Sequence, residues 1–319
     1  MAQARDGKEL YGKLVTVLGG SGFLGRHLAQ ELLARGARLR IVSRNPRRAF
    51  QLKTLGNLGQ VQFVRCDVTR PEGLGAALTG ADAVVNLVGS FTGNLDAIQG
   101  EGAGRIAAAA RDAGVAAFIH VSAIGGDVES PADYARSKAE GEAAVLAAFP
   151  QATIVRPSIL FGADDNFVQM FAGLIASFPV LPVFGPEAKL QPVFVDDAAE
   201  AIAHLLADPA AHSGKTYEIA GPEVITMLDL NERIAAAQQR KRLFVPLPDG
   251  LAQAIAIIPG TPISRDQFAL LQAGNVAAPT ALGLRQLGIA PRPLSLFLDR
   301  WMVQFRKHGR FGTKLGAGS

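Results

Sequence analysis

The sequence lacks the features that mark secreted and membrane-spanning proteins. Its 319 residues include a single cysteine, Cys66, so no disulfide can form within the chain and nothing suggests an oxidising compartment. No apolar run approaches the roughly 20 residues that a helix needs to span a bilayer. The first residues carry Asp6 and Glu9 and no apolar core, so we expect neither a secretory signal nor a transit peptide. These absences predict a protein that is soluble or peripheral to a membrane.

Metal-ligand and nucleic-acid patterns are absent as well. The histidines lack the spacing of metal ligands, so we expect no metal; they are His27, His120, His204, His212 and His308. The net charge is +4, but no nucleic-acid-binding fold or aromatic platform accompanies it, so we expect no nucleic-acid partner. The basic residues at the C-terminus predict a tail over 309–319 that is solvated or lies on an anionic membrane or partner.

What the sequence does contain is a regular alternation of strand-like and helix-like segments up to about Pro157. Six apolar runs are typical of strands: Leu14–Leu18, Arg38–Val42, Val61–Cys66, Ala83–Val88, Ala116–Val121 and Thr153–Arg156. Most are continuously apolar rather than alternating, as in a sheet that is covered on both faces. The order of the segments predicts an α/β fold built on a doubly wound parallel sheet.

The first of these strands runs directly into a glycine-rich turn, Gly19-Gly-Ser-Gly22-Phe-Leu-Gly25, which opens a helix-like segment, Arg26–Arg35. In a dinucleotide site the first glycine permits the tight turn, and the second lets the backbone approach the pyrophosphate. The third allows the helix to pack closely on the strand. The helix N-terminus then presents free N–H groups to the phosphates. Because the triplet follows a strand and opens a helix, it indicates a Rossmann-type dinucleotide site rather than a plain loop.

The end of the second strand indicates which dinucleotide binds. NAD sites usually place Asp or Glu here, whereas this chain has Ser43 and Arg44. A guanidinium can hold a 2′-phosphate through forked, charge-assisted hydrogen bonds, so we favour NADP(H) over NAD(H); the alternative is a solvated basic turn. The residues expected to contact the cofactor are Gly19, Ser21, Gly22, Phe23, Leu24, Gly25, Ser43, Arg44, Arg48, Asp67, Val68, Leu87, Val88, Gly89, Ser122, Tyr134, Lys138, Pro157 and Ile159.

A tyrosine and a lysine four residues apart follow the fifth strand. Ser130 is the expected N-cap of their helix, and the spacing puts Tyr134 and Lys138 on one helix face. Lys138 would bind the nicotinamide ribose and lower the pKa of the phenol, so that Tyr134 exchanges a proton with a carbonyl or alcohol oxygen. Ser122, at the end of the fifth strand, would orient a substrate oxygen or the cofactor. The alternative is an exposed pair at helical spacing.

The texture of the sequence changes after about Ile159. Proline-rich stretches at Phe178–Pro192 and Leu243–Pro262 interrupt the alternation, although Val193–Val195 and Thr216–Ile219 still have the pattern of short strands. We expect an N-terminal extension (1–12), a dinucleotide-binding domain (13–159), and a smaller, interrupted substrate or docking domain (160–308) with segments that return to the first sheet. In that domain Leu294–Lys307 combines aromatic and basic residues, so it would lie at a bilayer interface, dock in a protein groove, or pack on its own domain.

The glycine triplet, the Tyr134–Lys138 pair and Val193-Phe-Val-Asp-Asp197-Ala resemble the extended and atypical branches of the short-chain dehydrogenase/reductase superfamily. A narrower resemblance, from about Lys13 to Pro293, is to the NADPH-binding accessory subunit of respiratory complex I and its bacterial relatives. The strings that carry it include Asp82-Ala-Val-Val-Asn-Leu-Val-Gly89 and Phe161-Gly-Ala-Asp-Asp-Asn-Phe167. Active extended members usually have serine where this chain has Ala123, which leaves Ser122 as the nearby hydroxyl.

The resemblance implies a bound NADPH that serves structure, assembly or sensing in the respiratory NADH:quinone oxidoreductase. It implies peripheral-arm and membrane subunits as partners, close to the membrane and the quinone site, with lipid contact an open alternative. The expected location is the cytoplasmic face of a bacterial inner membrane, and the mitochondrial matrix side of the inner membrane and the cytosol are alternatives. Because Tyr134 and Lys138 are both present, a free-standing reductase, dehydrogenase or epimerase is the second functional hypothesis. An NADP(H)-binding redox sensor is the third.

Overall fold

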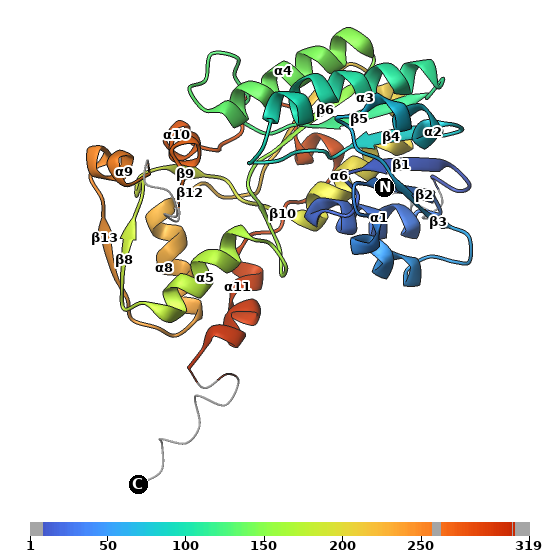
Figure 1. The fold of residues 1–319 in the computed structure, drawn as a ribbon. Coiled ribbons are helices and arrows are strands. Elements are labelled where there is room, and N and C mark those ends of the chain that lie inside the picture. The colour runs from blue at the N-terminus through green and yellow to red at the C-terminus, as the bar shows by residue number, and fades with distance from the viewer. Residues whose placement is uncertain (1–8, 257–262, 308, 310–319) are drawn as a thin grey trace. The chain divides into compact units, whose positions relative to one another are not determined.

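The computed structural model describes residues 9–256, 263–307 and 309, and it divides the chain into two compact units (Figure 1). Of the described residues, the first unit holds those up to Pro157 together with Val195–Ile219 and Ala278–Ala290. The second unit holds Ser158–Phe194 and the described residues within 220–277 and from Pro291 onward. Two later segments of the chain therefore return to the first unit.

A seven-stranded parallel sheet forms the centre of the first unit, in the order β11-β6-β5-β4-β1-β2-β3. Its strands are β1 (Leu14–Leu18), β2 (Arg38–Ser43), β3 (Val61–Arg65), β4 (Ala83–Asn86), β5 (Ala117–Val121), β6 (Thr153–Pro157) and β11 (Thr216–Ile219). The doubly wound α/β fold is confirmed, and the six early strands begin and end within two residues of the expected positions. The strand order reverses between β1 and β4, which is where sheets of this kind bind ligands.

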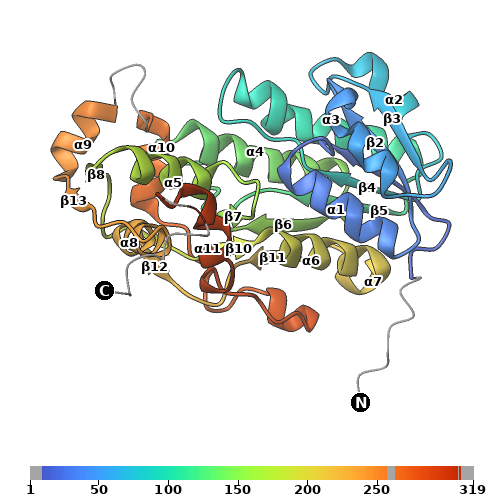
Figure 2. The same cartoon turned by 90° about the horizontal axis from the view of Figure 1, so that it is seen from below.

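Helices cover both faces of this sheet (Figure 2). On one face α1 (Phe23–Ala34) lies beside α6 (Val195–Ala207); on the other α3 (Glu101–Asp112) packs against α4 (Asp133–Ala148) and α2 (Leu74–Leu78). Shorter helices of the unit are η1 (Pro46–Thr54), η2 (Pro71–Gly73), the π-helix η3 (Asp96–Gly100), α7 (Pro209–His212) and η4 (Leu284–Leu287). Cys66 is buried in the core on the α2–α4 side, as a small apolar residue would be.

The second unit contains three two-stranded sheets. The parallel pairs are β7 (Leu160–Phe161) with β10 (Val193–Phe194) and β8 (Val180–Val183) with β13 (Leu243–Pro246); β9 (Lys189–Leu190) and β12 (Ile225–Thr226) are antiparallel. Its helices are α5 (Phe167–Ser177), α8 (Met227–Ala237), α9 (Asp249–Ala256), α10 (Arg265–Ala273), α11 (Ser295–Trp301) and η5 (Met302–Phe305). The expected strand at Val193–Val195 is one residue too long, because Val195 already opens α6.

The aromatic residues of α11 pack within their own unit. Phe297 stacks on Phe194 with ring centroids 4.3 Å apart, and Trp301 stacks on Phe297 at 4.9 Å. Leu298 and Met302 are buried beside them, whereas Leu296 on the opposite side is 65% exposed. Of the three roles expected for this segment, the described residues show packing on its own domain. None of the described helices is both long enough and apolar enough to cross a membrane.

Candidate functional site

The glycine-rich turn joins three strands of the first unit. Gly19 has a left-handed backbone (φ +75°), and its N–H donates to the Val42 carbonyl at the end of β2. The N–H of Leu87, just after β4, donates to the Leu18 carbonyl. A Cβ on Gly25 would lie 2.6 Å from the Gly20 Cα, so only glycine lets α1 approach the turn this closely. The turn, the end of β2 and the end of β4 therefore meet at the switch point of the sheet.

The N-terminus of α1 points into this meeting place as an anion-binding element. The helix begins at Phe23 with Gly22 as its N-cap, and no side chain caps the first turn. No acidic residue lies in that turn either, so the positive end of the helix dipole is not neutralised there. The helix is 12 residues long and its N-terminus lies at the glycine-rich turn, which is the arrangement that holds a pyrophosphate.

The ends of β2 and β3 bring together the residues expected around the adenosine. The Ser43 hydroxyl is buried and has no hydrogen-bond partner among the described residues. Hydrogen bonds from Thr69 hold the pKa of Asp67 below its usual range, and the charge of Arg44 contributes to that shift. Arg44 and Arg48 are both exposed, and Val68 is buried. A basic group and an unsatisfied hydroxyl thus lie where a 2′-substituted ribose would bind.

The segment after β4 is fixed by two side chains, one of which the sequence did not single out. The Asn86 carbonyl oxygen accepts from the Val88 N–H at 3.1 Å, and the Gln99 carbonyl oxygen accepts from the Ser90 N–H at 3.0 Å. A Cβ on Gly89 would lie 3.2 Å from the Lys138 ammonium and 3.4 Å from Gln99 Oε1. The segment Leu87–Gly89 therefore runs between the glycine turn and Lys138. Gln99 lies in the π-helix η3, a helix type that no sequence pattern had indicated.

Tyr134 and Lys138 lie on one face of α4, with the Lys138 ammonium over the Tyr134 ring and bound to a backbone carbonyl. The Lys138 Nζ donates to the Val121 carbonyl at 3.2 Å and lies 5.9 Å from the centroid of the Tyr134 ring. The ring of Phe91 stacks on the ring of Tyr134, with centroids 4.3 Å apart and an interplanar angle of 13°. The expectation that Ser130 is the N-cap of α4 is wrong. The helix begins only at Asp133, with Ala132 as its N-cap, and the Ser130 hydroxyl accepts from the Ala132 N–H.

Burial dominates the electrostatics of this pair. Desolvation raises the pKa of Tyr134 to about 12 and lowers the pKa of Lys138 to about 8. Burial therefore shifts the phenol pKa in the direction opposite to the one expected from Lys138. His120, which the Lys138 charge also opposes, has its pKa lowered by burial to about 3 and is neutral. Its Nδ1 lies 3.1 Å from Asn86 Nδ2.

Ser122 and Pro157 lie at the ends of two neighbouring strands of the first unit, β5 and β6. The Ser122 hydroxyl is buried and finds no hydrogen-bond partner within the described ranges. Its backbone N–H donates to Val155 at 2.7 Å, and the Ile124 N–H donates to the Pro157 carbonyl, which joins the ends of β5 and β6. Ile159 lies in the second unit, where its N–H donates to the Asn275 side chain. Phe91 and His120 were not predicted as site residues, since an aromatic in a loop and a histidine in a strand have no distinguishing spacing.

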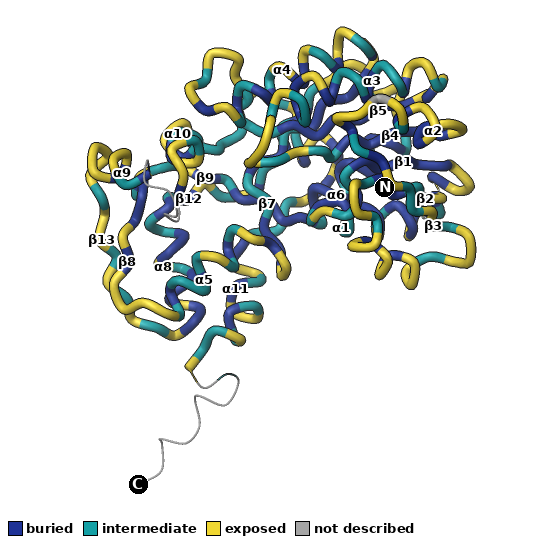
Figure 3. Tube along the Cα trace, in the orientation of Figure 1, coloured by how far each residue is buried: buried dark blue, intermediate teal, exposed yellow. Residues whose placement is uncertain are grey.

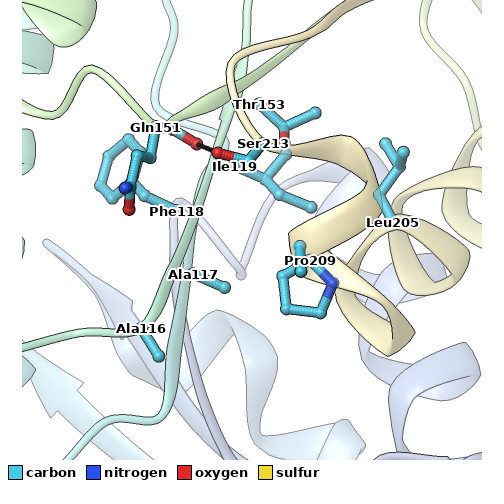
Figure 4. A pocket seen from close by; sticks show the side chains of 10 residues that line it. Ala116, Ala117, Phe118, Ile119, Gln151, Thr153, Leu205, Pro209 and Ser213 are labelled. Carbon is cyan, nitrogen blue, oxygen red and sulfur yellow. Dashed lines mark hydrogen bonds between the residues drawn. The ribbon is translucent and has the colours of Figure 1, made fainter.

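A cavity of about 330 Å³ lies elsewhere in the first unit and is not this site (Figure 4). It is lined by Ala116, just before β5, and by Thr153, where β6 starts, with Leu205 and Pro209 on the other wall (Figure 4). Because the strands are parallel, the amino ends lie at the edge of the sheet opposite the glycine turn. Within the described residues, no three His, Cys, Asp or Glu side chains gather closely enough to hold a metal ion.

The residues present fit a nicotinamide dinucleotide. The glycine turn would leave no room for side chains, and the buried hydroxyls of Ser43 and Ser122 lack partners among the described residues. The α1 N-terminus would hold the pyrophosphate, and Lys138 would reach the nicotinamide ribose. When bound, the nicotinamide supplies hydride transfer; Ser122 and Tyr134 would then orient an oxygen and hold a proton at the phenol.

This fold and this site define a nicotinamide-dinucleotide-binding protein of the doubly wound α/β class. The chain belongs to the NAD dependent epimerase/dehydratase family, whose family model matches residues 15–220. It is 32% identical, over 95% of its length and 80% of the relative's, to a mitochondrial protein of Arabidopsis thaliana, NADH dehydrogenase (ubiquinone) 1 alpha subcomplex subunit 9.

Two further similarities are more limited. A ceramide reductase of Caulobacter vibrioides is 36% identical, over 58% of each chain. The triphenylmethane reductase of Citrobacter sp., solved in complex with NADP(H), superposes with a TM-score of 0.68 at 19% identity, over 90% of this chain and 99% of that chain. The second likeness shows a shared fold alone.

Proposed function

We propose that this protein is an NADP(H)-binding accessory or assembly subunit of the respiratory NADH:quinone oxidoreductase. The observation that carries the proposal is similarity over nearly the whole chain, in both units, to the subunit 9 protein of Arabidopsis. The relative's name places it in the ubiquinone-linked NADH dehydrogenase. The sequence similarity between the two proteins extends through the second unit of this chain. A nucleotide-binding domain shared by the two proteins would not by itself require that.

We assign the cofactor a structural or sensing role rather than turnover. In this site Phe91 covers one face of the Tyr134 ring, and burial raises the phenol pKa to about 12. The Lys138 ammonium is engaged by the Val121 carbonyl. A phenol whose pKa lies this far above physiological pH is a poor general acid or base there. The bound nucleotide would instead tie together the ends of β1, β2, β4 and β5.

NADP(H) is the dinucleotide that the end of β2 favours. Ser43 and Arg44 stand where an acidic residue would bind the ribose 2′-hydroxyl of NAD, and Arg44 already contributes to the electrostatics of the neighbouring Asp67. A 2′-phosphate would complete this site with two charge-assisted contacts, from Arg44 and Arg48.

The partners that we propose are peripheral-arm and membrane subunits of the same complex. The protein would then lie on the cytoplasmic face of a bacterial inner membrane, close to the quinone site. Contact with lipid would be secondary in this arrangement, since Phe297 and Trp301 of α11 are engaged within their own unit. The mitochondrial matrix side is the equivalent location in an organelle.

Purification of the full-length chain from membranes in mild detergent tests this function. The expected result is tightly held NADPH in the released nucleotide, together with subunits of the NADH:quinone oxidoreductase in the same preparation. A protein that purifies alone and exchanges its nucleotide freely would contradict the proposal. Tyr134→Phe is the matched variant, because an accessory role predicts that it retains both the nucleotide and the subunits.

A carbonyl reductase is the second candidate, and one observation favours it. Tyr134 and Lys138 are both intact, and the similarity to a ceramide reductase covers 58% of the chain. In this role a bound cofactor and substrate would displace Phe91 and draw Lys138 toward the ribose. NADPH oxidation with a long-chain oxo-lipid that disappears in Tyr134→Phe would support this candidate over the first.

A further inference from the structure

The positive charge of the chain is concentrated along one edge of the first unit. Between Glu31 and Asp67 the sequence has eight basic residues and no acidic residue, whereas the whole chain has a net charge of only +4. The rest of the protein is therefore net acidic. Arg35 pairs with Glu31, and Arg40 donates to the carbonyls of Ala77 and Thr79, so these two are structural.

Several of the remaining basic side chains are exposed and have no role in the nucleotide site. They are Arg47 and Lys53 on η1 and Arg65 at the end of the edge strand β3. None of the three forms a salt bridge with a residue that the structure describes. Charges left exposed and unpaired in this way cost little in water, but they attract an acidic surface over the range of the Debye length, ~8 Å in physiological salt.

Large apolar side chains lie among these charges, in the segment between β2 and β3, most of which is coloured as exposed (Figure 3). Phe50 on η1 is 52% exposed and meets Phe63 of β3 edge to face, with ring centroids 5.0 Å apart. Leu55 is 51% exposed, and Leu58 is fully exposed. A single exposed leucine needs no explanation, but three large apolar residues within nine positions beside an edge strand resemble the centre of an interface.

A groove runs along the same surface between α1 and η1. It has a volume of about 290 Å³ and is lined by Arg26, His27, Gln30, Gln51, Leu52, Thr54 and Leu55. Two glutamines offer amide donors and acceptors that match an extended peptide backbone, and Leu55 belongs to both the groove and the apolar row. His27 is already engaged by the Asp196 carboxylate of α6, 2.5 Å away.

We infer that the η1 surface, defined by Arg47, Phe50, Lys53, Leu55, Leu58 and Arg65, docks an acidic segment of a partner protein. The segment would place a large apolar side chain on Phe50 and Leu58 and carboxylates against Arg47, Lys53 and Arg65. A protein segment fits better than a bilayer, because the adjoining groove is concave and polar. The inference rests on the proposed function, which makes the partner a subunit of the respiratory complex.

The test uses the full-length chain and a matched control. Lys53→Glu combined with Leu58→Ser reverses one charge and removes one apolar contact at exposed positions. The control is Lys241→Glu, an equally exposed charge reversal in the second unit. Each variant is purified from membranes in mild detergent, and three quantities are measured: the respiratory-complex subunits recovered, the nucleotide content, and the thermal unfolding temperature.

The η1 surface predicts that the double variant recovers at least tenfold fewer subunits, at unchanged nucleotide content and unfolding temperature, while Lys241→Glu matches the wild type. A photo-crosslinking amino acid at Leu58 should then join the chain to an acidic stretch of one subunit. Recovery that is equal in the wild type and the double variant would overturn the inference but leave the proposed function standing. A wild type that recovers no subunits would contradict the function itself.

Binding to vesicles of phosphatidylcholine with phosphatidylglycerol distinguishes the other occupant. A double variant that loses vesicle binding but keeps its subunits would show that the surface meets anionic lipid, which also overturns the inference. Equal sedimentation of wild type and double variant with these vesicles is the result that an acidic protein partner predicts.

Discussion

The ring of Phe91 lies nearly parallel to the ring of Tyr134, with the centroids 4.3 Å apart. This stack places a residue from the loop after β4 on a side chain of α4, where it covers one face of the phenol ring. The Lys138 ammonium, one helical turn away, is bound to the Val121 carbonyl instead. The pair that the sequence suggested for proton transfer is therefore a desolvated phenol and a buried ammonium.

Tyr134 should lose its proton far above the ordinary tyrosine range. Burial raises its pKa from 10.0 to about 12, so the folded state favours the neutral phenol. The resulting contribution to the free energy of unfolding is fully present below pH 10 and is lost as the pH rises through about 12. A pH-jump absorbance titration of wild type minus Tyr134→Phe should show phenolate forming near pH 12, and Phe91→Ala should lower that midpoint by admitting water. A wild-type midpoint near 10 would argue against the shielding.

Lys138→Met should stabilise the cofactor-free protein at pH 7. Burial lowers the lysine pKa from 10.5 to about 8, so the unfolded chain binds more protons between these values and stability rises with pH across that window. Below pH 8 the folded protein carries the full cost of a buried ammonium, up to ~3 kcal/mol. Urea unfolding at pH 7 and pH 10 should show a gain at pH 7 and a flattened pH dependence. Equal pH slopes in wild type and variant would contradict the assignment, and weaker nucleotide binding should accompany the gain.

Gly25→Ala should damage both folding and nucleotide binding. The new Cβ would lie 2.6 Å from Gly20 Cα and 2.7 Å from Gly20 C, which are backbone atoms of the turn itself. We expect a loss of ~3 kcal/mol or more, typical of a steric clash in a packed site. Gly75→Ala in α2 is the control: its Cβ meets nothing within 4 Å and should stabilise the helix by ~0.5–1 kcal/mol. Calorimetry and nucleotide titration of the two variants measure the contrast; similar behaviour would remove the close approach from the account.

Arg44→Asp should shift the nucleotide preference from NADPH towards NADH. Loss of charge-assisted hydrogen bonds worth ~1.5–3 kcal/mol corresponds to ~10- to 100-fold weaker NADPH binding. The new carboxylate can accept from the ribose 2′-hydroxyl of NADH. Fluorescence titration with both nucleotides measures this, with Arg47→Asp as the exposed neighbour that should leave both affinities unchanged. NADPH binding that survives Arg44→Asp would place the 2′-phosphate elsewhere.

The nucleotide-binding half of the fold follows directly from local sequence. A continuous apolar run such as Leu14–Leu18 suits a strand that is buried on both faces, and a glycine triplet directly after it leaves few other structures. For that reason the six early strands were predicted within two residues, whereas the helix after the turn begins at Phe23, three residues before the expected Arg26. The same logic located Arg44 and Asp67, because parallel strands end at a common edge.

Other features depend on contacts that the sequence does not reveal. The paired residues of strands β8 and β13 lie 63 positions apart in proline-rich stretches (Val180 pairs with Leu243), and only their pairing makes them strands. The stack of Phe91 on Tyr134 depends on where a loop lies after folding. The Tyr134 pKa shifts opposite to the predicted direction, because spacing shows that a lysine is near but not that burial raises the phenol pKa.

The accessory role is tested by the nucleotide content and the subunit composition of Tyr134→Phe, purified from membranes beside the wild type. Both proteins should retain NADPH and the same respiratory-complex subunits, because the phenol takes no part in either interaction. A wild type that lacks those subunits and reduces a carbonyl substrate, with the activity lost in Tyr134→Phe, would contradict the accessory role and establish the enzyme instead.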